Sequence, residues 1–121
     1  MSDQIDEIRS SRDAALDALD TSIISIGDRI AVTTTVGPFL DQLTKRHQDL
    51  VREHDAISRA ATDAVLALPT VIAAAAALRT LSASMQMTAQ DLPNATKVLT
   101  TTAKILSLGQ QFVDLIATAQ K

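Results

Sequence analysis

Apolar residues recur at alternating steps of three and four along almost the whole of this chain of 121 residues. The clearest run consists of Leu40, Leu43, His47, Leu50, His54, Ile57, Ala61, Ala64 and Leu68. Side chains at this spacing fall on one face of an α-helix. Comparable stripes precede and follow this run, so the pattern predicts an all-α fold built from amphipathic helices.

Glycine and proline mark the breaks between these helices. Gly37 suits the left-handed end of one helix and Pro38 suits the first turn of the next, while Pro69 predicts a later break. We therefore expect helices near 3–35, 38–67, 70–90 and 94–120 in a single domain spanning 1–121. Short connections favour an antiparallel four-helix bundle with up-down-up-down topology. The alternative is three long helices, in which Pro69 only kinks a helix spanning 38–90.

Composition narrows the classes of function. Cysteine is absent, which excludes disulfide bonds and thiolate chemistry. The formal net charge is -3 and the sequence has no Tyr or Trp, so it lacks both the positive charge and the aromatic rings typical of a nucleic-acid binder. The start of the chain lacks the features of a secretory signal, so a cytoplasmic location is expected. The uncharged run 64–78 contains Pro69 and is shorter than the roughly 20 residues that cross a bilayer, so no transmembrane segment is expected.

His47 and His54 are the candidates for site chemistry. They lie two turns apart, roughly 10 Å along a helix, which is too far to share one metal ion, and neither has a second ligand three or four residues away. We expect both rings at the edge of the core, with their nitrogens reaching water or a hydroxyl of Thr21, Ser22 or Ser25. A pH-sensitive interface and a ligand role stay open as alternatives.

Catalytic patterns are missing from the sequence. Gly27, Gly37 and Gly109 are isolated, so they form no phosphate-binding loop, and no serine or carboxylate joins a histidine at the spacing of a nucleophile and base. We therefore predict a protein that is not an enzyme and that uses no metal and no cofactor.

Charge is distributed unevenly between the two halves of the chain. Residues 1–63 carry most of the charged side chains, whereas residues 64–121 carry few. The leading prediction is an interaction or scaffold protein, which forms a homo-oligomer or binds a helical protein partner through its charge-poor C-terminal half by burying apolar stripes. The residues expected to line this contact, although some of them must form the internal core, are Val71, Leu78, Leu81, Met85, Val98, Ile105, Phe112 and Ile116.

An acidic row in the first predicted helix suggests another kind of partner. Asp6, Asp13, Asp17 and Asp20 follow one another beside its apolar stripe. One interpretation is an adaptor or inhibitor that docks a basic partner on Asp13, Asp17 and Asp20. The other is an acidic bias that keeps the chain soluble.

A third hypothesis is an amphipathic protein that binds a lipid or polymer surface by opening its helices. In composition the chain resembles the phasins, small helical proteins that coat polyester storage granules. The segment 106–112, with the sequence LSLGQQF, is similar in character to their C-terminal helices. The resemblance covers only these few residues and implies a granule-coating role.

Overall fold

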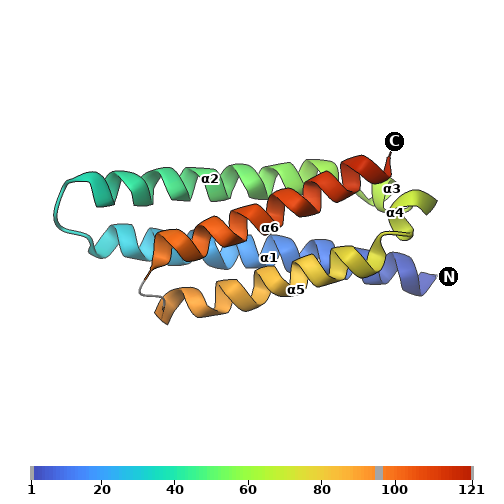
Figure 1. The fold of residues 1–121 in the computed structure, drawn as a ribbon, viewed down its shortest axis with the longest axis horizontal. Coiled ribbons are helices and arrows are strands. Elements are labelled where there is room, and N and C mark those ends of the chain that lie inside the picture. The colour runs from blue at the N-terminus through green and yellow to red at the C-terminus, as the bar shows by residue number, and fades with distance from the viewer. Residues whose placement is uncertain (1, 95–96, 121) are drawn as a thin grey trace.

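The computed structural model describes residues 2–94 and 97–120, and every regular element in this part of the chain is helical (Figure 1). The prediction of an all-α fold is confirmed. The elements are α1 (Ser2–Val32), α2 (Pro38–Ala60), α3 (Asp63–Leu66), α4 (Pro69–Ile72), α5 (Ala75–Asp91), the short 3-10 helix η1 (Leu92–Asn94) and α6 (Val98–Ala119).

The four long helices pack in a specific pattern. Helix α1 contacts both α2 and α5, and α6 also contacts both α2 and α5. Figure 1 shows that α1 and α5 run in one direction along the molecule and that α2 and α6 run in the other. The neighbours α1 and α2, and α5 and α6, therefore pack antiparallel as expected. The described residues of α2 and α5 share no comparable contact, so the packing expected between these two consecutive long helices is not found. The remaining packed pairs, α1 with α5 and α2 with α6, are parallel.

The apolar stripes meet in a common core. Each long helix contributes fully buried side chains, because no amphipathic helix can shield its own stripe from water. Leu66 on α3 and Leu92 on η1 are fully buried as well, and the largest fully buried side chains are Ile8, Leu19, Ile26, Leu43, Leu50, Ile57, Leu66, Leu78, Met85, Leu92, Ile105 and Phe112. They line the interior along the whole length of the molecule.

Helix α1 carries a row of small buried side chains, and one of them, Ser11, lines a recess between α1 and α5 together with Ser82. Ser11, Ala15, Ala18 and Ser22 are buried on α1 at steps of four, three and four. Small side chains allow two helix axes to approach closely. The hydroxyl groups need no partner on the other helix, since Ser22 Oγ, for example, donates to the carbonyl oxygen of Ala18 at 2.7 Å.

The connection between α1 and α2 differs from the expectation at one end. Helix α1 ends at Val32 rather than near residue 35, and a run of β-branched residues, which are poor helix formers, follows it. Gly37 is not left-handed: its φ of 169° is extended backbone at the N-cap of α2. Pro38 opens α2 in its first turn, as predicted.

The segment after α2 departs most from the sequence prediction. Helix α2 ends at Ala60 rather than near residue 67, because Thr62 begins a new helix and its Oγ1 accepts a hydrogen bond from Val65 N at 3.4 Å. Pro69 is the first residue of α4. The alternative of one bent helix over 38–90 is therefore wrong, and the predicted helix 70–90 is divided between α4 and α5. The predicted helix 94–120 begins later, at Val98, and residues 95–96 lie outside the described residues.

Replacing Ala15 by leucine tests the close packing of α1 on α5. Ala15 is fully buried, so the added carbon atoms have no room. We expect Ala15→Leu to lower the free energy of unfolding by about 1–3 kcal/mol, measured by urea unfolding followed by circular dichroism. The control Ala103→Leu, on the exposed face of α6, should change it by less than about 0.5 kcal/mol. Equal effects at the two positions would contradict a close-packed interface.

Candidate interaction surfaces

The apolar residues predicted to contact a partner lie mainly inside the chain. Of the eight, Leu81 is partly buried against the core and the others are buried. Val98, the most exposed of these seven, retains 3% of its surface, and Phe112 and Ile116 retain none. A partner could reach these side chains only if the helices separated.

A different set of residues faces outward on α5. Four exposed positions recur at steps of four, three and four on the side of α5 opposite its buried stripe, and Met87 is 68% exposed. None of them is charged. We call this set the outer α5 stripe; it consists of Ala76, Thr80, Ala83 and Met87. The sequence analysis did not identify this stripe, because the larger buried residues of α5, such as Leu78 and Met85, form the stronger apolar pattern.

Charges are sparse around the outer α5 stripe. Arg79 is engaged with α1, since its Nη1 lies 2.8 Å from Oε1 of Glu7. The other charged side chains on α5 and α6 are Asp91, Lys104 and Asp114, and all three are exposed. On α6, Asp114 accepts a hydrogen bond from Gln110 Nε2 at 2.9 Å. The predicted charge-poor half of the chain therefore presents a nearly uncharged surface along α5.

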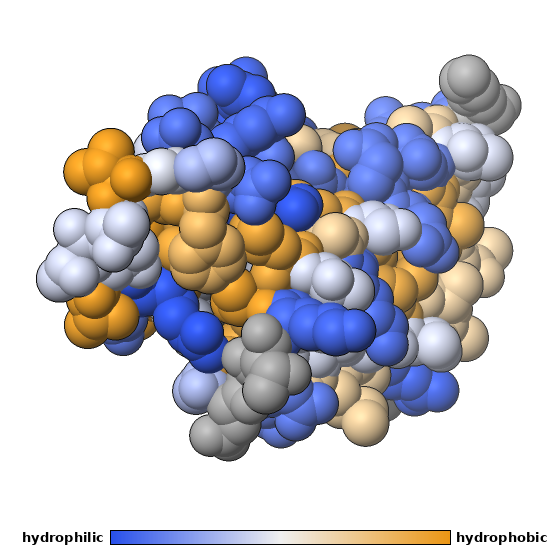
Figure 2. All heavy atoms as spheres, turned by 60° about the vertical axis from the view of Figure 1, so that its left-hand side comes forward, coloured by the Kyte–Doolittle hydropathy of each residue, from blue (hydrophilic) through white to orange (hydrophobic). Residues whose placement is uncertain are grey.

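A second exposed apolar surface lies where α1 leads into α2. Val32, Val36 and Phe39 are 74%, 85% and 49% exposed. Figure 2 brings this end of the molecule forward and shows hydrophobic side chains there among hydrophilic ones. We call these three residues the α1–α2 tip.

The acidic row of α1 is exposed but partly neutralised. Asp13 accepts a hydrogen bond from Arg12 Nε at 3.1 Å, and Oδ1 of Asp20 lies 3.3 Å from Nε2 of His54 on α2. Asp6 lies 3.8 Å from Arg9. Asp17 is exposed between these pairs. A basic partner would have to compete with Arg9 for Asp6 and with Arg12 for Asp13.

Arg12 joins three elements at the opposite end from the tip. Its Nη1 donates to the carbonyl oxygen of Ala61 at 3.2 Å and to Oδ1 of Asp63 at 2.7 Å. The hydrogen bond from Arg12, together with the positive charges of Arg12 and Arg9, lowers the pKa of Asp63, and the same hydrogen bond raises the pKa of Arg12. Arg12 thus satisfies a carbonyl left free where α2 ends and fixes the start of α3 against α1.

The two histidines lie at partly buried positions on α2. His54 faces Asp20 on α1 rather than one of the hydroxyl groups expected for it. Ser22, one of those candidates, donates to its own helix instead.

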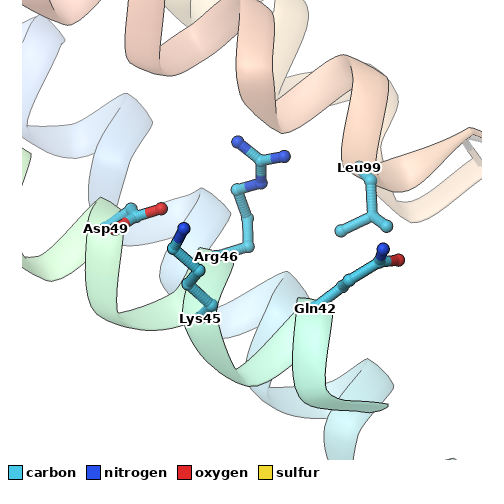
Figure 3. A pocket seen from close by; sticks show the side chains of 5 residues that line it. All are labelled: Gln42, Lys45, Arg46, Asp49 and Leu99. Atoms are coloured by element: carbon cyan, nitrogen blue, oxygen red, sulfur yellow. The ribbon is translucent and has the colours of Figure 1, made fainter. Parts of the chain in front are cut away.

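The surface recesses are small and open. One, of about 260 Å³, lies between α2 and α6 and is lined by Gln42, Lys45, Arg46, Asp49 and Leu99. Figure 3 shows Lys45 and Arg46 extending from α2 toward α6. Its volume falls below the roughly 300–1,000 Å³ of typical small-molecule sites, and three of its five lining side chains are charged. A recess of about 330 Å³ beside Arg12 and Asp63 is more open still.

Two further properties concern residues 2–94 and 97–120 only. No group of three or more His, Cys, Asp or Glu side chains there is arranged to hold a metal ion. None of the helices there combines the length and the apolarity required to cross a bilayer.

Comparison of the chain with protein-family models, with curated proteins and with solved structures finds no match.

Arg12→Ala tests the role of Arg12 as an anchor. The variant leaves the carbonyl of Ala61 and the carboxylate of Asp63 without their donor. We expect a loss of about 1–2 kcal/mol in the free energy of unfolding and faster amide hydrogen exchange over residues 61–68. The control Arg59→Ala removes only an exposed pair with Asp55 at 3.3 Å, and should cost about 0.3–0.5 kcal/mol. Equal losses would mean that Arg12 contributes no more than a surface charge.

Proposed function

We propose that this chain is a non-enzymatic interaction protein, in which α1, α2, α5 and α6 form one closed four-helix bundle and a second copy docks on the outer α5 stripe. The observation that carries the proposal is the stripe itself: Ala76, Thr80, Ala83 and Met87 are exposed, uncharged and spaced as in a helix–helix contact. Exposed apolar side chains at such spacing are typical of protein contact sites.

The chemistry of the stripe favours a second copy as the partner. An isologous contact places the same residues of two chains against each other, so the surface must be complementary to itself. Small uncharged side chains meet this condition, because they bring neither like charges nor bulky groups together. Met87 at one end can adapt its shape to the opposite helix.

The larger apolar residues predicted from the sequence have a supporting role in this proposal. Leu78, Met85, Ile105 and Phe112 hold α5 and α6 in the bundle, which presents the outer α5 stripe as a rigid surface. A rigid surface loses little conformational entropy on binding.

Thr80→Glu/Met87→Glu tests the proposed contact. We expect the native mass, measured by light scattering over a dilution series, to be that of a dimer for the unmodified chain and of a monomer for the variant, because four carboxylates would face each other at the contact. The control Thr44→Glu/Val51→Glu introduces the same charges, with the same spacing, on the exposed face of α2, and should remain a dimer. An unmodified chain that is monomeric at every concentration would refute self-association.

A second candidate function is binding to a lipid or polymer surface. The α1–α2 tip favours it, because Val32, Val36 and Phe39 are exposed together at one end of the molecule. Such side chains can enter an apolar phase without any change in the packing of the core.

Flotation with phosphatidylcholine vesicles tests this second candidate. The unmodified chain should float with the vesicles, and Val36→Asp/Phe39→Asp should abolish flotation, because burying the new charges in lipid is unfavourable. Val51→Asp, at an exposed apolar position within α2, is the control and should float normally. If the unmodified chain stays with the soluble fraction, the tip does not bind lipid.

A further inference from the structure

A carboxyl oxygen in the interface between α2 and α6 has no hydrogen-bond partner. Oε1 of Glu53 on α2 is buried, and no donor among the described residues reaches it. A carboxylate can only accept hydrogen bonds, so in the charged form the buried Oε1 lacks the donor it needs. Native structures rarely leave a buried polar atom in this state, and the buried hydroxyl groups of Ser22 and Thr102, by contrast, donate to carbonyl oxygens of their own helices.

Gly109 on α6 creates the space that Glu53 occupies. Gly109 is buried, and a Cβ atom there would lie 2.9 Å from Cγ and 3.1 Å from Oε1 of Glu53. The carboxyl group therefore packs directly against the backbone of α6. Glycine inside a helix is unfavourable relative to alanine, so the close contact is maintained against local helix preference.

The charged groups near Glu53 do not compensate its charge. From α6, Asp114 adds a second negative charge. On α2, Asp49 lies one turn before Glu53, and its Oδ1 is 3.8 Å from Arg52; Arg46 lies two turns before it. From α1, Asp20 contacts His54 on the adjacent position of α2. Glu53 has no ion pair among these described groups.

Burial, and next the charge of Asp114, raise the pKa of Glu53 above the ordinary glutamate value. A carboxyl group whose pKa is higher in the folded chain than in the unfolded chain favours folding most when it is protonated. That advantage is present below the unfolded pKa and is lost as the pH rises through the folded pKa.

We propose that Glu53 makes the interface between α2 and α6 a pH-sensitive switch, in which the protonated carboxyl group keeps the two helices tightly packed against Gly109 and the ionised group loosens them. The ionised carboxylate can hydrate its buried Oε1 only by moving out of the interface, and this movement opens the side of the bundle between α2 and α6. Phe112 on α6 and Leu50 and Ile57 on α2 lie in the core behind it. The switch therefore controls access to apolar side chains that the closed fold hides.

The test measures unfolding of the full chain by urea between about pH 4 and about pH 8, for the unmodified chain and for Glu53→Gln at the same low protein concentration. Glutamine has the shape of the protonated acid and carries no charge. We expect the ratio of the unfolding equilibrium constants, unmodified chain over Glu53→Gln, to rise about five-fold over this range. Amide exchange along α6, corrected for the intrinsic pH effect, should slow in Glu53→Gln at the upper end of the range. A ratio that stays constant with pH would overturn the proposal.

Two variants and a control separate the switch from a general effect of charge. Gly109→Ala fills the space next to Glu53 and should force its flexible carboxyl group into solvent, which removes the pH dependence while the chain stays folded. Asp114→Asn should reduce the dependence without removing it. Asp17→Asn, at an exposed position of α1, should leave the pH profile of the unmodified chain intact. A pH profile for Gly109→Ala like that of the unmodified chain would also overturn the proposal. None of these residues belongs to the outer α5 stripe, so failure here is distinct from failure of self-association.

Discussion

Helices α1 and α5 pack side by side, and small side chains, such as Ser11 on α1 and Ser82 on α5, line the recess between them. Among the described residues α5 packs on α1 and α6 and shares no comparable contact with α2, so a tight turn that places α5 beside α2 is not used. The chain must instead cross the end of the molecule. The short helices α3 and α4 make this crossing, and α2 has to end at Ala60 to allow it. Arg12 then binds the crossing segment at Ala61 and Asp63.

The fold class could be predicted from the sequence because helical periodicity is a local signal. The steps of three and four seen around Leu43, Leu50 and Ile57 correspond to the buried face of α2. The end of α2 could not be placed in the same way, since Ala61, Ala64 and Leu68 continue the apolar spacing beyond it. The competing signal was the N-cap Thr62, followed by Asp63 in the first turn of α3. The capping residue, rather than the apolar periodicity, therefore determines where α2 ends.

The pairing of the helices is not encoded in any local pattern. Every stripe is apolar and of similar width, so periodicity alone cannot distinguish α5 from α6 as the second neighbour of α1. Side-chain size offers one such feature: the small side chains of Ser11 on α1 and Ser82 on α5 line the same recess between the two helices. The same limit affected the candidate contact residues. Phe112 and Ile116 are large apolar residues, and such residues are more often found in the core than on a contact surface. Both are fully buried here. The position of Glu53 in an interface could have been suspected from one feature of the sequence. Gly109 interrupts an apolar stripe, and a glycine there leaves space for a side chain of another helix.

The crossing over α3 and α4 also has a consequence for how the chain acquires its structure. The antiparallel pairs α1–α2 and α5–α6 join helices that are close in sequence, so each can form early as a hairpin with a low entropic cost of loop closure. The parallel pairs α1–α5 and α2–α6 join helices from opposite halves of the chain. They can form only when the two hairpins dock, and the docking step buries the small-residue interface and the Glu53 carboxyl group together. We therefore expect the last step of folding to resemble an assembly reaction between two halves of one chain.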